Sequence, residues 1–191
     1  MNKHTPQPNN ENTVLIVTAN PNKESSHTYA NAAVVEASVK AQGFSVVRKE
    51  AYDFPYFSAD NSAFDECADL LSRVKHVVFV GPMWNYTMPG AMKNWIDSSL
   101  RAREHFYFSE SGMPKGLIPN LQVHVVFTAG GPHWLYKLMP WNNQFTGLIK
   151  KIFKLCGVKK FHELSLCGRM KFTEDKQLKT FHKQIMNHKF Q

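Results

Sequence analysis

The sequence predicts a single α/β domain built on a five-stranded parallel sheet, with helices covering both faces. Five short apolar runs alternate along the chain with five segments whose apolar residues recur at helical spacing. The strand-like runs are continuous rather than alternating, which is typical of parallel strands buried on both sides. A chain of 191 residues with 43% hydrophobic and 20% charged residues is large enough to bury such a core.

The elements follow one another in a regular order. The expected strands are rich in valine, isoleucine, leucine and phenylalanine and span residues 14–18, 44–50, 77–80, 123–128 and 161–166. The expected helices span residues 29–41, 62–74, 91–103, 143–155 and 174–187. Gly43 and Gly157 follow two of these helices as stop signals, and Ser62 is placed to cap the second helix.

The same spacing predicts the apolar stripe of each helix. In chain order the stripes of the first four helices are Ala30, Ala33, Val34 and Ala37; Phe64, Cys67, Leu71 and Val74; Trp95, Ile96 and Leu100; and Phe145, Leu148, Ile149, Ile152 and Phe153. We expect these residues to face the sheet.

The number of strands limits the topology. Crossovers between parallel strands are right-handed, and five strands favour a flavodoxin-like three-layer sandwich of strand order 2-1-3-4-5. This order places a ligand crevice at the carboxyl ends of strands one and three. We expect one domain over residues 13–191, preceded by a disordered tail over residues 1–12.

Composition and charge indicate which partners and which cellular compartment to expect. The net charge of +8 is spread over scattered lysines without a nucleic-acid motif, so we expect no nucleic-acid partner, although a positive field would favour a phosphorylated dinucleotide. No apolar run is long enough to span a membrane and no signal peptide is evident, so we expect a cytoplasmic protein.

The three cysteines, Cys67, Cys156 and Cys167, lack the spacing of metal ligands. We therefore expect buried thiols and no metal site.

The loop after the first strand is rich in hydroxyl groups. Ser25, Ser26, His27 and Thr28 crowd the start of the first helix, where free N–H groups and the helix dipole favour an anion. The alternative is a simple N-cap, which uses only one of these side chains. Neither GxGxxG nor a Walker motif follows this strand, so the sequence does not predict a Rossmann or P-loop site.

Two further loops belong to the same expected crevice. The loop after the third strand carries Trp84, Asn85 and Tyr86, which either flank a flat ring or pack against the next helix or a dimer partner. The loop after the fourth strand contains Gly130 and Gly131, which allow a ligand to approach the backbone or simply form a turn. Hydroxyls for a phosphate, apolar groups for a ring and backbone N–H groups for ring heteroatoms together fit flavin mononucleotide (FMN).

At these residues the sequence resembles the flavodoxin-like NAD(P)H:quinone oxidoreductases and the FMN-dependent NADH-azoreductases. The resemblance extends over about residues 13–170. Its most specific part is the stretch PMWNYTMP at residues 82–89, and further similarity lies in the segments 19–28, 105–117 and 128–131.

The resemblance implies a role for each matching residue. The implied flavin-binding residues are Asn20, Ser25, Ser26, His27 and Thr28 on the phosphate side, Pro82, Met83, Trp84, Asn85 and Tyr86 beside the ring, and Thr128, Ala129, Gly130 and Gly131 at its pyrimidine edge. His133 and Tyr136 match a histidine and a tyrosine of the family patterns, and either is expected to stabilise charge on the reduced flavin or to protonate the substrate.

The function implied by the resemblance is a ping-pong oxidoreductase that passes hydride from NAD(P)H through FMN to quinones, azo compounds or similar flat acceptors. The resemblance also implies a homodimer, and the apolar segment 134–141 could form the dimer contact, the acceptor pocket or an inward-packed flap. FMN is expected rather than FAD because no long C-terminal extension is present. The alternatives are a regulatory subunit that reaches the membrane only through a potassium-efflux partner, and an electron carrier, which the positive charge disfavours.

Overall fold

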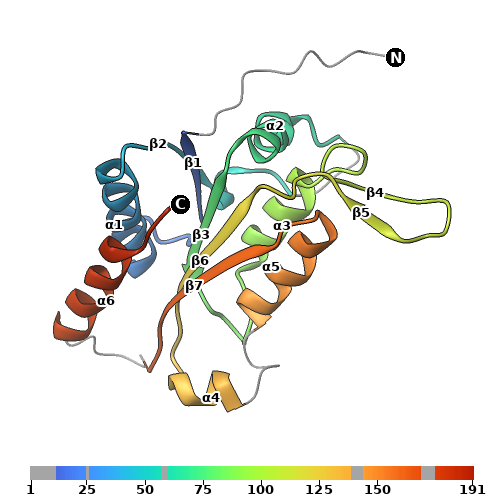
Figure 1. Cartoon of the computed structure of the whole chain (residues 1–191). Coiled ribbons are helices and arrows are strands. Elements are labelled where there is room, and N and C mark those ends of the chain that lie inside the picture. The colour runs from blue at the N-terminus through green and yellow to red at the C-terminus, as the bar shows by residue number, and fades with distance from the viewer. Residues whose placement is uncertain (1–11, 25, 57–59, 139–143, 169–174) are drawn as a thin grey trace.

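A five-stranded parallel sheet forms the centre of the molecule, in the order β2-β1-β3-β6-β7 (Figure 1). The computed structural model describes residues 12–24, 26–56, 60–138, 144–168 and 175–191. The strands of this sheet are β1 (Thr13–Thr18), β2 (Ser45–Glu50), β3 (His76–Pro82), β6 (Gln122–Thr128) and β7 (Lys160–Leu166). The expected α/β fold with a parallel sheet is therefore confirmed. Of the expected tail, residues 1–11 lie outside the described residues.

Helices cover both faces of the sheet. In Figure 1, α1 and α6 lie on one side of it and α2, α3 and α5 on the other. Their bounds are α1 (His27–Ala41), α2 (Asp65–Arg73), α3 (Gly90–Ser99), α5 (Gln144–Leu155) and α6 (Asp175–Asn187). Two 3-10 turns, η1 (Ala51–Asp53) and η2 (Ser62–Phe64), and the short helix α4 (His133–Leu138) complete the elements. No helix in the described part of the chain is both long and apolar enough to cross a membrane.

Two apolar cores result, one on each face. Leu15 and Val17 of β1 pack in the core formed with α2, α3 and α5, whereas Val14 and Ile16 pack in the core formed with α1 and α6. This division follows from the two-residue period of a strand. All six residues of β1 are buried, as the continuous apolar run predicted.

A two-stranded antiparallel hairpin of β4 (Phe106–Phe108) and β5 (Pro114–Gly116) was not predicted. With it counted, the fourth and fifth strands of the main sheet become β6 and β7, so the order differs in numbering from the expected 2-1-3-4-5. Each hairpin strand has three residues, and β5 contains proline and glycine, which are rare in strands. Periodicity therefore could not detect it.

The base of this hairpin is fixed to the end of α5 by close backbone contact. A Cβ atom on Gly116 would lie 2.0 Å from the backbone nitrogen of Gly157. Next to this contact, the Ile118 N–H donates to the Cys156 carbonyl at 3.0 Å. Only glycine allows the two backbones to approach so closely.

Two helix ends differ from the prediction. Ser62 does not cap α2; it begins η2, its N–H donates to Asp60 Oδ1 at 2.9 Å, and the N-cap position of α2 is Phe64. Helix α3 ends at Ser99 rather than at residue 103. It ends early because the chain turns there, and the N–H of Arg101 donates to the His105 ring at 2.9 Å.

The predicted stripe of the first helix was wrong for its three alanines, whereas Val34 is half-buried and packs against the core of that face. Ala30, Ala33 and Ala37 are exposed, and the buried residues of α1 are Thr28, Asn31, Ala32, Val35, Ser38 and Val39. Two polar members of this set bond to α6: His182 Nε2 lies 3.0 Å from Asn31 Oδ1, and Ser38 Oγ donates to the Ile185 carbonyl at 3.2 Å. The contact between α1 and α6, rather than the spacing of the alanines, therefore determines which face of α1 is buried.

The other stripes and the cysteines agree more closely with the prediction. The four predicted residues of the second stripe, Phe64, Cys67, Leu71 and Val74, are all buried. Cys67 and Cys156 are buried free thiols and Cys167 is half-buried. Burial raises the pKa of Cys156 to about 12, which keeps this thiol protonated.

Candidate functional site

Three loops meet at the carboxyl edge of the sheet because the strands before them are neighbours. Thr18 of β1 pairs with Val80 of β3, and Pro82 of β3 pairs with Thr128 of β6. The first hydrogen bonds beyond the strands continue this arrangement: the Met83 N–H donates to the Thr128 carbonyl at 2.7 Å. The structure thus brings together the loops that the sequence singled out.

The start of α1 presents an unsatisfied hydroxyl group. Ser26 is the N-cap residue, yet its side chain makes no capping hydrogen bond. Its Oγ atom is buried and has no hydrogen-bond partner among the described residues. A buried polar atom without a partner costs free energy, so this position fits a ligand that supplies one. A simple N-cap, the alternative considered from the sequence, is not formed.

The other predicted phosphate-side residues of this loop differ in whether their side chains are free to contact a ligand. Thr28 is buried and its Oγ1 accepts a hydrogen bond from Asn20 Nδ2 at 3.2 Å. His27 is exposed, and Ser25 lies outside the described residues. Ser26 is therefore the hydroxyl that the described geometry leaves for an anion at the helix dipole.

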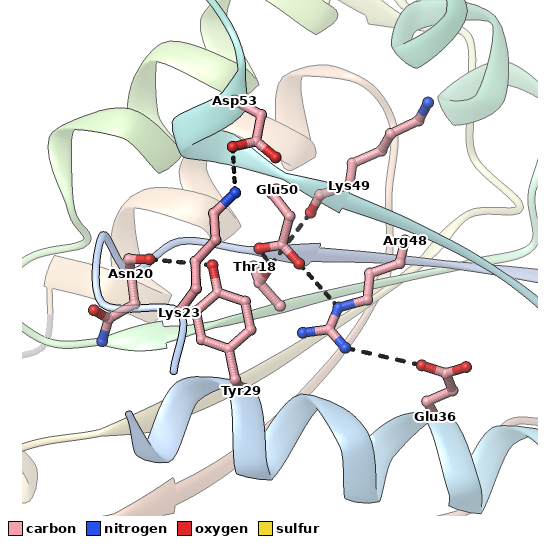
Figure 2. A network of polar contacts seen from close by, with 9 residues as sticks. All are labelled: Thr18, Asn20, Lys23, Tyr29, Glu36, Arg48, Lys49, Glu50 and Asp53. Atoms are coloured by element: carbon pink, nitrogen blue, oxygen red, sulfur yellow. Dashed lines mark hydrogen bonds and ion pairs between the residues drawn. The ribbon is translucent and has the colours of Figure 1, made fainter. Parts of the chain in front are cut away.

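A polar network holds the Asn20 loop against β2 (Figure 2). The hydroxyl of Tyr29 donates to the Asn20 carbonyl at 3.1 Å. The guanidinium group of Arg48 lies over the Tyr29 ring, 5.3 Å from its centroid. Arg48 Nε in turn lies 3.1 Å from Glu50 Oε1, and Thr18 donates to the same carboxylate. Burial of Tyr29 is the largest cause that raises its pKa, and the nearby Glu50 carboxylate raises it further. The hydroxyl of Tyr29 therefore stays protonated and remains a donor.

A further ion pair also holds this loop: Lys23 Nζ lies 2.5 Å from Asp53 Oδ1 of η1.

The sequence did not indicate that Tyr29, Arg48 or Glu50 belongs to the site. The available signal was the charged run of residues 48–50 at the carboxyl end of an otherwise apolar strand.

The second loop forms a tight turn that exposes its aromatic rings. Trp84 and Thr87 exchange two backbone hydrogen bonds, of 2.9 and 3.0 Å. Between them, Asn85 has φ 46° and Tyr86 has φ 68°, the left-handed pair of a type I′ turn. A bulky residue at positive φ is strained, and such strain concentrates at ligand sites.

The same turn separates exposed from buried side chains. Trp84 is 43% exposed and Tyr86 53% exposed, whereas Met83 and Met88 on either side are buried. Pro82 is buried and Asn85 is exposed. Because both rings are exposed, packing against the following helix does not account for them.

The third loop uses two of its N–H groups within the protein. The Ala129 N–H donates to the Leu166 carbonyl at 2.9 Å, and the Gly131 N–H donates to the hydroxyl oxygen of Tyr136 at 3.1 Å. A Cβ atom on Gly131 would lie 2.6 Å from this oxygen, so a larger residue would require the phenol to shift. Thr128 and Gly130 are half-buried beside them.

Helix α4 carries the two candidate catalytic residues. Tyr136 is half-buried, and burial raises the pKa of its phenol, although the hydrogen bond from Gly131 opposes the shift. His133 begins the helix, and its side chain is outside the described part of the structure. Trp134 and Leu138 are 61% and 73% exposed, and the remainder of the apolar segment, residues 139–141, is not described.

Comparison with known protein families matches residues 12–188 to the family described as flavodoxin-like fold. The chain belongs to this family. Among curated relatives of this flavodoxin-like protein is an FMN-dependent NADH:quinone oxidoreductase of Pelagibacter ubique (strain HTCC1062). It is 31% identical over 127 residues, which cover 65% of this chain and 63% of the relative.

A second relative is the FMN-dependent NADH:quinone oxidoreductase of Vibrio vulnificus (strain YJ016), which is 41% identical over 69 residues. The matched stretch covers 36% of this chain and 35% of that protein. The chain therefore matches less than two thirds of the length of these two relatives.

Solved structures share the fold over almost the whole chain. An FMN-dependent NADH-azoreductase from Bacillus anthracis in complex with FMN gives a TM-score of 0.81 at 18% identity, covering 92% of this chain and 96% of the other. An NAD(P)H:quinone oxidoreductase from Methanothermobacter marburgensis gives a TM-score of 0.73 at 14% identity, covering 95% and 98%. At these identities the likeness shows the flavodoxin-like fold alone.

Proposed function

We propose that this flavodoxin-like protein binds FMN and is an oxidoreductase that transfers hydride from NAD(P)H to quinones, azo compounds or similar flat acceptors. The observation that carries the proposal is the buried, unpartnered Oγ of Ser26 at the N-terminus of a 15-residue helix, within the described residues. The names of the two relatives, and the FMN complex among the similar structures, support the same cofactor.

The phosphate of FMN would be held at the start of α1. Ser26 Oγ would donate to a phosphate oxygen, while the first N–H groups of the helix point towards the same position. Ser25, His27 and Thr28 are proposed as neighbouring contacts. The network of Tyr29 and Arg48 keeps the Asn20 loop in one conformation, so little ordering is required when the phosphate binds.

The flavin ring would lie beside the turn formed by residues 84–87. The exposed rings of Trp84 and Tyr86 provide apolar walls, and Asn85 provides an amide for the polar edge of the ring. Thr128 and Gly130 would line the pyrimidine side. When bound, FMN supplies the hydride chemistry, and we propose that NAD(P)H and the acceptor occupy the same position in turn, which is a ping-pong mechanism.

Tyr136 is proposed to supply or hold a proton. Its hydroxyl oxygen accepts from the Gly131 N–H, so its own O–H remains directed to a different partner. Because burial raises the pKa of this phenol, the proton is present at neutral pH and can be donated to a reduced acceptor or to a nearby anionic group. His133 is the second candidate for this role.

We also propose a cytoplasmic homodimer. The support for the dimer is the exposed apolar surface of α4, where Trp134 and Leu138 are 61% and 73% exposed. Large exposed apolar groups of this kind mark interaction surfaces. The molar mass in solution, measured by light scattering during gel filtration, tests this part of the proposal, and a monomer mass over the working concentration range would contradict it.

The first test is an absorbance spectrum of the purified protein with added FMN, followed by anaerobic addition of NADH or NADPH. We expect flavin bands that shift on binding and bleach on reduction. Substitution of Ser26→Ala should weaken FMN binding by roughly tenfold or more, because hydrogen bonds to charged groups contribute about 1.5–3 kcal/mol. Ser45→Ala, at an exposed position at the start of β2, is the matched control. Failure of the protein to bind any flavin would refute the proposed oxidoreductase function and favour a regulatory role.

A further inference from the structure

A cluster of four histidines lies on the sheet face that α1 and α6 cover, apart from the three loops of the flavin site. His124 of β6 and His162 of β7 are paired in the sheet register, so their side chains point to the same face. Their rings stack with centroids 4.6 Å apart and planes 11° apart. His188, which follows α6, and His76 at the start of β3 complete the cluster.

His188 is brought to the sheet by the segment that follows α6. The side-chain nitrogen Nε2 of Gln42 donates to the His188 carbonyl at 2.9 Å, and Gln42 Oε1 accepts from the Phe190 N–H at 3.0 Å. Gln122 Nε2 donates to the Gln191 carbonyl at 2.5 Å. These bonds fix the segment across the end of α1 and the start of β6, which places the imidazole of His188 against His124.

The ring nitrogens of three of these histidines converge. One nitrogen from each of His124, His162 and His188 lies within 4.8 Å of the other two. His124 Nδ1 and His188 Nε2 are 2.8 Å apart. His162 Nε2 is buried, and within the described chain it has no hydrogen-bond partner. A buried imidazole nitrogen without a hydrogen-bond partner, beside two converging ring nitrogens, can act as a metal ligand.

We propose that His124, His162 and His188 form a binding site for one divalent transition-metal ion of the zinc type. Zinc binds imidazole nitrogen at about 2.0–2.1 Å, so tetrahedral ligand atoms stand about 3.4 Å apart. One pair of these nitrogens is 2.8 Å apart and all three lie within 4.8 Å of one another, so rotations of the half-buried His162 and His188 rings would bring them to this separation. Three histidines leave the fourth position to water.

The ligand type selects the class of metal. The converging group contains imidazoles only. Magnesium and calcium require oxygen ligands and would not bind here. Zinc, cobalt, nickel and copper bind imidazole nitrogen.

His76 would act as a positioning residue. Its Nδ1 lies 3.1 Å from His124 Nε2, the nitrogen that faces away from His188. With the metal on His124 Nδ1, the opposite Nε2–H would donate to His76 Nδ1, which fixes the ring orientation as outer hydrogen bonds do at histidine metal sites. His76 itself is fully buried, and the Phe44 and Phe190 rings pack edge-on against it.

Metal binding would join three segments that are distant in sequence. The ion would link β6, β7 and the residues after α6, so it would stabilise the packing of α6 on the sheet. This role is independent of FMN. The sequence predicted no metal site because these histidines are not at ligand spacing and only the fold brings them together.

The test is titration of the unsubstituted chain, free of any polyhistidine tag. Binding of ZnCl₂ is measured by calorimetry, and binding of CoCl₂ is measured by visible absorption. We expect one ion per chain, a rise in the unfolding temperature with Zn²⁺ but not with Mg²⁺, and the intense bands of tetrahedral Co²⁺. His162→Gln and His188→Gln should each weaken Zn²⁺ binding at least tenfold. His76→Gln should weaken it about 10–100-fold while leaving the stoichiometry unchanged.

The matched control is His182→Gln. His182 lies on α6 and bonds to Asn31, outside the converging group. This variant should bind Zn²⁺ as the unsubstituted protein does, and all variants should retain FMN binding and cooperative unfolding without metal. The inference is overturned if Zn²⁺ binds no more tightly to the unsubstituted chain than to His162→Gln, or if His182→Gln loses binding to the same extent. Neither outcome bears on the flavin site.

Discussion

The hydroxyl oxygen of Tyr136 lies 3.1 Å from the backbone nitrogen of Gly131 and accepts its hydrogen bond. This contact ties the short helix α4 to the loop after β6, and it directs the phenol towards the carboxyl edge of the sheet. The arrangement allows the proposed catalytic role of Tyr136 and its structural contact to be tested separately.

Tyr136→Phe removes the proton donor and leaves the Gly131 N–H without its present partner. We expect the turnover of quinone with NADH to fall by about 10²-fold, the lower end of what general acid catalysis contributes, whereas FMN affinity changes little. Steady-state kinetics and FMN titration check this. Gly131→Ala is the comparison, because its Cβ would displace the phenol, so both turnover and FMN affinity should fall. Equal turnover of Tyr136→Phe and the unsubstituted protein would exclude the proposed role.

Tyr86→Gly should have opposite effects on stability and on binding. Removal of a bulky side chain at φ 68° relieves about 1–2 kcal/mol of backbone strain, while the exposed ring that would flank the flavin is lost. We expect an unchanged or higher free energy of unfolding together with weaker FMN binding. Arg103→Gly provides the control, because it relaxes another non-glycine residue at positive φ, 73°, at an exposed position outside the three loops. Equal FMN affinity of Tyr86→Gly and Arg103→Gly would contradict the assignment of Tyr86.

Tyr29→Phe tests the network in Figure 2. The substitution removes the hydroxyl that donates to the Asn20 carbonyl and keeps the ring beneath Arg48. Because the loop then samples more conformations, FMN affinity should fall several-fold, with a small loss of stability of about 1 kcal/mol. The control is Tyr56→Phe, whose side chain is 81% exposed. FMN titration by fluorescence quenching measures both, and identical affinities would show that the network does not order the phosphate loop.

His105 should make stability depend on pH. The ring is fully buried, its Nε2 lies 3.0 Å from the Ala68 carbonyl, and its Nδ1 accepts from the Arg101 N–H. Burial lowers the pKa of His105, so the folded protein holds it neutral where an unfolded histidine, with a pKa of about 6.5, takes up a proton. Its contribution to stability is therefore complete above about pH 6.5 and is lost as the pH falls below that value.

Urea unfolding of His105→Asn between pH 7.5 and about 5.5 measures this contribution. The variant keeps an acceptor for the Arg101 N–H and has no titrating group at this position. We expect its stability to fall less over this interval, by up to about 1 kcal/mol, than that of the unsubstituted protein. Parallel stability curves would show that other groups account for the acid sensitivity.

The sequence predicted a secondary-structure element correctly where burial against the sheet alone determined its apolar pattern. The continuous apolar run of β1 and the stripe of α2 were predicted correctly because burial on the sheet decides both. The three alanines of the predicted α1 stripe were wrong because Asn31 and Ser38 are buried by bonds to α6, and such bonds leave no periodic signal.

The site was predicted at the level of loops rather than of contacts. Alternation of strands and helices identified the three loops, since strand ends meet at one edge of a parallel sheet. The left-handed turn at Asn85 and Tyr86, and the contact of Gly131 with Tyr136, depend on backbone geometry that residue types alone do not encode.

The contact between Gly116 and Gly157 gives the β4–β5 hairpin one fixed end and one open end. At the base, the two backbones meet without space for a side chain, whereas the tip at Gly112 and Met113 is exposed and a Cβ atom on Gly112 would meet nothing within 4 Å. We therefore expect the hairpin tip to accept an inserted peptide, such as an epitope or a fluorophore tag. The same insertion next to Gly116 would separate the hairpin from α5 and disturb the core behind it.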